Sequence, residues 1–487
     1  MLFNSWKFLV FFPAAAAAYF LAPHRFRWPL LLAASLFFYM LFSPYHILIA
    51  GSMILVSYGA GILIERSDGN KKKAFLIAGM TAIFMFLFVF KYFNFFLDSV
   101  SAAALLFNVT FSTGALTLLI PVGISYIAFQ VASYLIEVHR GGQAAERHFG
   151  IFALSVLFFP KILSGPIERP QDLLHQFHER HDFDAERIAD GLKLMAWGFF
   201  KKVVVADRLA IIVNHVYGRV GEYSGFPLFL AVVIFAFQLY YDFSGYTDIA
   251  LGSARVLGFR LTQNFDRPYS ARSLTDFWRR WHISLSAWIR DYLYAPIAIN
   301  RRYWGKGGVV FALMVAFTLC GLWHGASWNF VIFGAINGLG LSVEFLTQKK
   351  RKKLEERLPK FLSAFLNIGV TFFYFAFSLI FFRSATVSES FYVITHLFAD
   401  FRSSTVLFLT KVKMLPVMGL GDFEFKIALV SIVIVQVVDY IQRRGPVCGQ
   451  VAAQPAWKRF GLYYLLLMGI ALFGVFSGKV PFIYFNF

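Results

Sequence analysis

The feature that most constrains the fold of this chain is a series of apolar segments, each about 20 residues long. Clear examples lie at residues 74–96, 226–251 and 361–382. Each is long enough for one helix to cross a hydrocarbon core of about 30 Å. Of the 487 residues, 58% are hydrophobic, and the mean hydropathy is +0.62. The short alternating strands of an outer-membrane barrel are missing from this pattern. We therefore predict an all-α polytopic membrane protein.

The basic residues gather in short loops between the apolar segments, and the net charge is +19. Clusters lie at residues 71–73, 349–353 and 442–459. The positive-inside rule places them on the cytoplasmic side, where they face anionic lipid headgroups. Because no nucleic-acid-binding motif accompanies them, we expect membrane lipids and no nucleic acid as partners. The loops predict about 12 crossings with both termini outside the cytoplasm.

Shorter segments refine this topology. The N-terminal segment lacks a basic start and leads directly into further apolar segments, so we expect a first transmembrane helix rather than a signal peptide. The apolar run at 151–160 ends in proline, and we expect it to be re-entrant. Since no Pro-, Gly- or Ser-rich linker divides the chain, we predict one membrane domain over residues 1–487.

One histidine lies between two apolar segments, in the sequence GLWHGASWNF that begins at Gly321. Ionisable side chains at membrane depth are uncommon and usually face a cavity or a pathway. Gly321 and Gly325 on either side of His324 permit close backbone approach or a break in the helix. Trp323 and Asn329 could supply a wall and a polar partner. On residue chemistry alone, a general base and a structural histidine both remain open.

A second histidine lies in SLTDFWRRWHISLSAWIRDYLY, for which we predict one helix over residues 273–294. Its apolar and aromatic residues recur at helical spacing and form one face, which consists of Trp278, Trp281, His282, Leu285, Trp288, Ile289 and Tyr292. We expect this helix to lie at the cytoplasmic membrane surface with its tryptophans at headgroup level. Arg279 and Arg280 fall elsewhere on this helix, where they could contact an anion or lipid headgroups. His282 is either a hydrogen-bonded packing residue or a polar group that lines a tunnel from the cytosol.

Three polar residues interrupt the apolar sequence YYDFSGYTDIALG, namely Asp242, Ser244 and Asp248. They could orient a histidine or bind an ion, and helix-end capping with packing is the alternative. The sequence contains no zinc signature, phosphate-binding loop or nucleophile elbow. The histidines of HQFHERH lie in a polar loop without cysteine, so we expect no metal site.

The two histidine segments, WRRWHISLSAWIRDYLY and GLWHGASWNF, resemble the membrane-bound O-acyltransferase (MBOAT) family. They are most similar to its bacterial branch of alginate and peptidoglycan O-acetyltransferases and teichoic-acid D-alanyl transferases. Further similar segments follow in order along most of the chain: FKYFNFF, PVGISYIAFQ, FFPKILSGPIERP, YYDFSGYTDIALG, NFDRPY and the terminal PFIYFNF. The resembling core motifs cover about residues 90–345, and C-terminal helices with the aromatic tail cover about 361–487.

The resemblance implies a ring of transmembrane helices around a thinned centre, with a cytoplasmic and an outer funnel that meet near the catalytic histidine. It makes His324 that catalytic residue and His282 the second functional histidine. Residues expected to line the donor and acceptor paths are Trp278, Arg279, Arg280, Trp281, Asp242, Ser244, Asp248, Trp323 and Asn329.

The activity that the resemblance implies is O-acyl transfer in a bacterial cytoplasmic (inner) membrane. The donor would be a cytoplasmic thioester, either acetyl-CoA or an acyl-phosphopantetheine carrier, and no tightly bound cofactor is expected. The implied partners are a polysaccharide acceptor and an extracytoplasmic SGNH-type acyltransferase. We expect the acyl group to be acetyl. Transfer of D-alanine to teichoic acid is an alternative, and a transporter or channel is an alternative from a different class.

The terminal PFIYFNF adds one hypothesis. In this branch such a tail has been linked to an acyl relay on its tyrosine, here Tyr484. A phenol with a pKa near 10 needs a base at neutral pH, and His324 could provide it. The alternative is an aromatic anchor at the outer interface.

Overall fold

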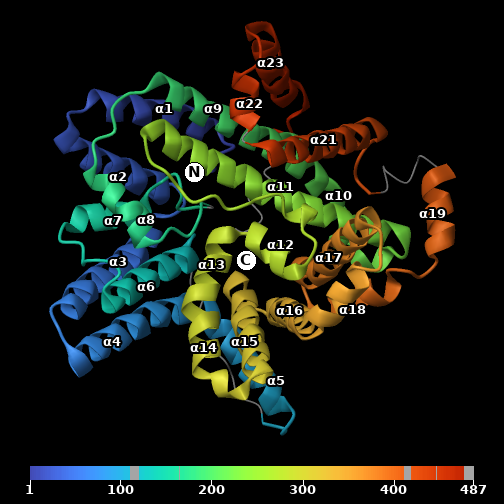
Figure 1. Cartoon of the computed structure of the whole chain (residues 1–487), viewed down its shortest axis with the longest axis horizontal. Helices are drawn as coiled ribbons and strands as arrows, with labels where there is room; N and C mark the ends of the chain where they lie inside the picture. Colours follow the sequence, from blue (N-terminus) through green and yellow to red (C-terminus); the bar gives the residue numbers. More distant parts are fainter. Residues whose placement is uncertain (110–119, 164, 411–417, 446, 477–487) are drawn as a thin grey trace. The chain divides into compact units, whose positions relative to one another are not determined.

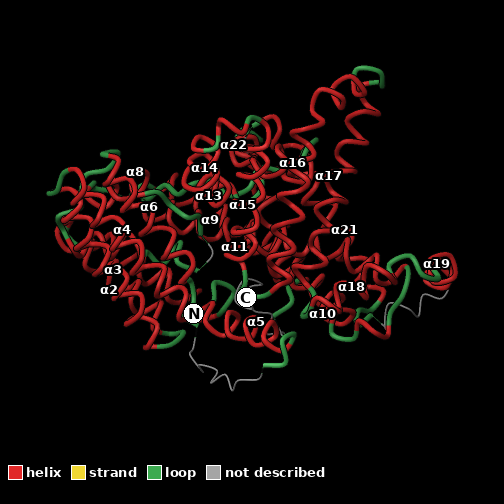
Figure 2. Tube along the Cα trace, turned by 90° about the horizontal axis from the view of Figure 1, so that it is seen from below, coloured by secondary structure: helices red, strands yellow, loops and turns green. Residues whose placement is uncertain are grey.

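The computed structural model describes residues 1–109, 120–163, 165–410, 418–445 and 447–476, and these residues form helices, turns and loops without a β-strand (Figure 2). The predicted all-α class is confirmed for this part of the chain.

Seven helical stretches within the described ranges are long and apolar enough to cross a membrane. They are α3 (Pro44–Glu65), the continuous stretch Gly69–Leu105, α11 (Phe226–Leu257), α15 (Lys306–His324), α16 (Trp328–Glu355), α17 (Lys360–Arg383) and α23 (Ala456–Phe473). The apolar segments 74–96, 226–251 and 361–382 all fall inside this set. The apolar helix α1 (Trp6–Leu21) is shorter, with 16 residues. The total of about 12 crossings stays a prediction.

The chain divides into two compact units, the first of which comprises residues 1–192 and 250–262. Its helices include α2 (His24–Met40), α4 (Gly69–Leu87), α6 (Ile124–Arg140) and α7 (Phe149–Leu157). α3 packs against both α4 and α6, and α2 packs against α7 (Figure 1). With nine residues, α7 is too short to cross a membrane, as expected of a re-entrant segment.

The second unit comprises residues 193–249 and 263–487. It contains α10 (Asp207–Tyr217), α12 (Leu274–Arg280), α13 (Ile283–Ile289), α14 (Ala295–Asn300), α18 (Val387–His396), α19 (Phe401–Thr410), α21 (Asp422–Ile441) and α22 (Val447–Ala452), besides α15, α16, α17 and α23. The boundaries between the units fall inside α9 (Ala185–Phe199) and α11 rather than in linkers. The single domain expected from the sequence stays a prediction.

α15 and α16 form a close helical hairpin whose turn is residues 325–327 (Figure 1). Glycines allow the approach: a Cβ on Gly321 would overlap the carbonyl oxygen of Phe330 and lie 2.8 Å from the backbone of Gly334. α15 ends at His324, and Gly325 continues in an extended conformation. Both roles that the sequence predicted for the flanking glycines are therefore present, and the hairpin determines where His324 lies.

Candidate functional site

The predicted helix over 273–294 is interrupted, and the expectation of one continuous helix is wrong. α12 ends at Arg280, α13 begins at Ile283, and residues 290–294 follow as a π-helical turn. The break occurs because His282 adopts a left-handed backbone with φ 44° and ψ 56°. The predicted start is confirmed, since the Ser273 hydroxyl accepts a hydrogen bond from the backbone N–H of Asp276 at 3.1 Å.

The tryptophans of this segment pack inside the protein rather than against lipid, and their expected depth at headgroup level stays a prediction. Trp278 and Trp281 are buried. The ring of Trp281 lies 5.1 Å from that of Phe375 on α17, and the ring of Trp278 lies 5.1 Å from that of Phe317 on α15. The face was assigned correctly, but neighbouring helices cover it instead of lipid.

His282 is fully buried at the break between α12 and α13. Its Nδ1 lies 3.1 Å from Oδ1 of Asn264, and its ring packs against Phe243 at 4.7 Å and Trp323 at 6.1 Å. This segment lies outside the seven candidate spans. Burial lowers the pKa of His282 well below its ordinary value, and the charge of nearby His324 lowers it further. His282 is therefore neutral near pH 7, with one ring nitrogen able to accept a proton.

His324 is the last residue of α15 and is buried among aromatic side chains. The rings of Trp323, Phe382 and Phe333 lie 5.0, 5.4 and 6.1 Å from the His324 ring. Because Trp323 contacts both imidazoles, the structure brings the two predicted histidines together in one aromatic cluster of the second unit. A pair of buried imidazoles in such surroundings can accept and return a proton away from bulk water.

Asn329, the polar residue expected beside His324, connects two helices. Its Nδ2 donates a hydrogen bond to the backbone carbonyl of Ser384, the residue after α17, at 2.7 Å. Asn329 thereby holds the start of α16 against the end of α17, which carries Phe382.

The acidic residues of α11 pair with two lysines that were not predicted from the sequence. The Lys202 ammonium lies 2.6 Å from Asp242 and 2.7 Å from Asp207. Lys201 lies 2.7 Å from Asp248 and donates a hydrogen bond to the Ser244 hydroxyl at 3.0 Å. These contacts give the acids lysine partners, and the two predicted roles, orienting a histidine or binding an ion, stay predictions. Charges buried at this depth require such partners.

Both lysines lie on a π-helical turn at 200–206. The sequence feature that could have revealed them is the pair of lysines inside the apolar sequence GFFKKVVVAD. The ion pairs are linked to the histidine cluster, because Phe243 follows Asp242 directly and packs on His282. We interpret the acids as groups that hold α11 behind the site.

The two arginines of α12 differ in their surroundings. Arg280 pairs with Asp276 at 2.8 Å and lies 3.9 Å from Asp266. Arg279 is exposed. Of the two, Arg279 is therefore the better placed to contact an anion from solution.

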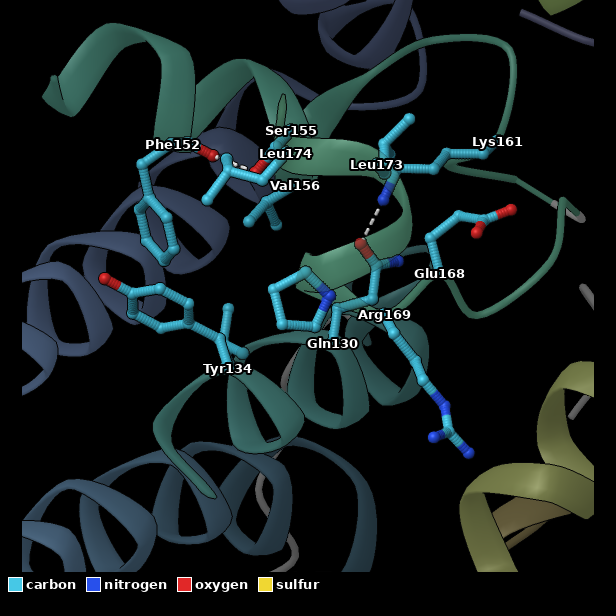
Figure 3. Close-up of a pocket in the computed structure, with 12 residues that line it drawn as sticks. Gln130, Tyr134, Phe152, Ser155, Val156, Lys161, Glu168, Arg169, Leu173 and Leu174 are labelled. Atoms are coloured by element: carbon cyan, nitrogen blue, oxygen red, sulfur yellow. Dashed lines mark hydrogen bonds between the residues drawn. The ribbon is translucent and has the colours of Figure 1, made fainter. Parts of the chain in front are cut away.

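The first unit contains a small pocket that includes the buried polar side chains of Gln130, Lys161 and Glu168 (Figure 3). Lys161 donates a hydrogen bond to Oε1 of Gln130. Glu168 accepts hydrogen bonds from the Thr262 backbone N–H at 2.6 Å and from the Thr262 hydroxyl at 2.8 Å. Burial lowers the pKa of Lys161 and raises the pKa of Glu168. The hydrogen bonds to Glu168 connect its segment to the chain after α11.

The two remaining predictions concern the acyl relay on Tyr484 and a metal site. Tyr484 lies outside the described residues, so relay and anchor both stay open. Among the residues that the structure describes, no group of three or more His, Cys, Asp or Glu side chains is arranged to hold a metal ion.

Comparison with known proteins gives consistent matches. The model of the family described as MBOAT, membrane-bound O-acyltransferase, matches residues 151–391, which contain both histidines. A protein described as a probable alginate O-acetylase from Azotobacter vinelandii is 39% identical over 352 residues, covering 71% of this chain and 68% of that protein. The peptidoglycan O-acetyltransferase of Helicobacter pylori is 32% identical over 412 residues, covering 77% of each chain. The teichoic acid D-alanyltransferase of Streptococcus thermophilus is 29% identical over 266 residues, covering 51% of this chain and 62% of that protein.

Proposed function

The chain belongs to the membrane-bound O-acyltransferase family and is an acyltransferase, and from this premise we propose that it O-acetylates a cell-envelope or exported polysaccharide. Relatives named for acetyl transfer match the chain at higher identity and over more of its length than the relative named for D-alanyl transfer. Acetyl is therefore the acyl group that we propose, and D-alanine is the alternative. Membership of an acyltransferase family argues against the transporter or channel that the sequence left open.

The observation that carries the proposal is the aromatic cluster that contains both His282 and His324. A thioester donor is already activated, so the protein must position its carbonyl carbon and remove a proton from the attacking hydroxyl. We assign that proton to His324. The hydroxyl oxygen then bonds to the carbonyl carbon, the carbon–sulfur bond breaks, and the departing thiolate takes up the proton.

The setting of this reaction is part of the proposal. The donor is a cytoplasmic thioester, acetyl-CoA or an acyl-phosphopantetheine carrier, and exposed Arg279 is the group that we propose contacts its phosphate. The protein spans the bacterial inner membrane with both termini outside the cytoplasm, in line with its basic loops. An extracytoplasmic SGNH-type protein is the proposed partner for transfer to the polysaccharide. A relay through Tyr484 stays a prediction.

The proposal is tested by the acetyl content of envelope polysaccharides, measured by NMR in cells with and without this chain. Polysaccharide acetyl esters should disappear without the chain and should stay absent when His324→Gln is supplied in its place, because removing a general base costs about 100-fold or more in rate. His46→Gln is a matched control, since His46 is also buried at the start of a candidate span, and it should restore acetylation.

Membrane abundance of each variant is measured in parallel. Full acetylation by His324→Gln at normal abundance would remove His324 from the proposed role. Loss of D-alanyl esters instead of acetyl esters would favour the alternative acyl group.

A further inference from the structure

Asn264 lies in the NFDRPY segment and makes a set of contacts that the proposed reaction does not yet use. It is fully buried, and its backbone carbonyl accepts a hydrogen bond from the N–H of Ile283 at 2.9 Å. Its side-chain oxygen lies 3.1 Å from Nδ1 of His282, 3.2 Å from the backbone nitrogen of Ser284 and 2.9 Å from the Ser284 hydroxyl. One amide thus holds the left-handed break on which His282 lies.

The orientation of this amide follows from the chemistry of its neighbours. The backbone N–H of Ser284 can only donate a hydrogen bond, so the Asn264 atom that faces it must be the oxygen. Rotating the amide by half a turn would place an N–H₂ group against that N–H and would leave two donors facing each other. The contact atom is therefore Oδ1, which has no hydrogen to give.

This orientation of the amide determines which ring nitrogen of His282 carries the hydrogen. An amide oxygen accepts only, so a hydrogen bond between Asn264 Oδ1 and His282 Nδ1 requires the hydrogen to be on Nδ1. In a neutral imidazole the other nitrogen, Nε2, then carries the lone pair. Phe243 of α11 and Trp323 of α15 also pack on the ring, and His324 is a titratable neighbour.

We propose that Asn264 is a positioning residue that keeps the hydrogen of His282 on Nδ1 and so keeps Nε2 as the proton acceptor of the ring. The tautomer follows from the described contacts alone, whereas its importance for acyl transfer rests on the proposed function. Asn264 acts through His282 and does not itself touch the reacting atoms.

The first test is the tautomer itself, read from the ring nitrogens of ¹⁵N-histidine-labelled protein by solid-state NMR in lipid bilayers. The chain has 11 histidines, so the His282 signals are identified by their loss in His282→Gln. The wild-type protein should show a protonated Nδ1 and an unprotonated Nε2. A wild-type ring with its hydrogen on Nε2 would overturn the proposal whatever the activity of the enzyme.

Three variants separate positioning from packing. Asn264→Leu removes the acceptor, so the hydrogen of His282 should no longer be confined to Nδ1, and a signal for protonated Nε2 should appear. We expect kcat to fall by about 10-fold or more. Ser284→Ala removes a different donor to the same oxygen and should keep the wild-type tautomer. Unchanged His282 signals in folded Asn264→Leu would contradict the assignment.

Asn264→Asp keeps an acceptor oxygen but adds a negative charge beside His282, which favours the imidazolium form. The proposal requires a neutral His282 beside the base His324, so the acid limb of the pH–rate profile should move to higher pH, while kcat at the best pH exceeds that of Asn264→Leu. A purely structural role would lower the rate at every pH without moving the limb, and that result would overturn the proposal. If the wild-type protein transfers no acetyl group, the proposed function fails, and the NMR result still decides the tautomer.

Discussion

His282 shows how single residues shape this site. Its backbone φ of 44° lies in a region that costs about 1–3 kcal/mol for a residue other than glycine, and such strain persists only where the surroundings hold it. Here the hydrogen bond from the backbone N–H of Ile283 to the backbone carbonyl of Asn264 provides that support, together with the side-chain amide of Asn264. The strain places a neutral imidazole beside Trp323, within electrostatic reach of His324.

The depressed pKa of His282 predicts how stability depends on pH. Below the ordinary value of 6.5 the unfolded chain binds a proton at this residue while the folded chain still does not. Protons therefore favour the unfolded state, and stability falls as pH falls below 6.5, by up to about 1.4 kcal/mol per pH unit. The thermal unfolding midpoint in detergent should drop less between pH 7.5 and about 5.5 in His282→Gln than in the wild-type protein.

The control for this measurement is His175→Gln, because the His175 side chain is 58% exposed and should leave the pH dependence unchanged. An identical fall of the midpoint in wild-type protein and His282→Gln would show that His282 is not the group responsible.

Local sequence was sufficient to find both histidines, because each is a polar residue in an apolar or aromatic setting. It was not sufficient for Asn264, whose contacts reach 18 residues along the chain to His282. It also missed the pairing of Lys201 and Lys202 with α11, because Asp248 and Asp242 lie about 40 or more residues along the chain from them. Pairing across such distances depends on how helices pack, which side-chain periodicity does not report.

At the scale of helices, the α15–α16 hairpin is the element that carries His324. The sequence located both helices and the turn between them from hydropathy and from the glycines. It also predicted the buried face of 273–294, although not the break, because a left-handed residue does not disturb the spacing of apolar side chains. The break depends on hydrogen bonds to residues 264–266, which lie outside that segment.

The close crossing of this hairpin predicts different effects for the same substitution at two glycines. Gly321→Ala places a methyl group against backbone atoms of α16 and should cost about 1–3 kcal/mol, with loss of acetylation as His324 shifts. Gly369→Ala on α17 meets no atom within 4 Å and should be neutral or stabilising by up to about 1 kcal/mol. Thermal unfolding of both variants checks this, and equal midpoints would contradict the close packing of α15 on α16.

At the scale of the whole molecule, some apolar helices are buried inside the protein and others are exposed on its surface. In α11, 72% of the apolar window is buried, whereas none of the window of α23 is. Burial explains how α11 tolerates Asp242 and Asp248, since lysines neutralise them inside the protein rather than in lipid. Hydropathy alone does not separate lipid-facing helices from buried or short ones, which is why it predicted the class of the fold more firmly than the number of crossings.

The central claim is that His324 serves acetyl transfer from a donor on the cytoplasmic side. The most direct measurement supplies acetyl-labelled acetyl-CoA to sealed membrane vesicles of both orientations and follows label in the polysaccharide fraction. Inside-out vesicles with the wild-type chain should incorporate label, whereas right-side-out vesicles, and inside-out vesicles with His324→Gln, should not. Equal incorporation by His324→Gln and wild-type protein at matched abundance would contradict the account.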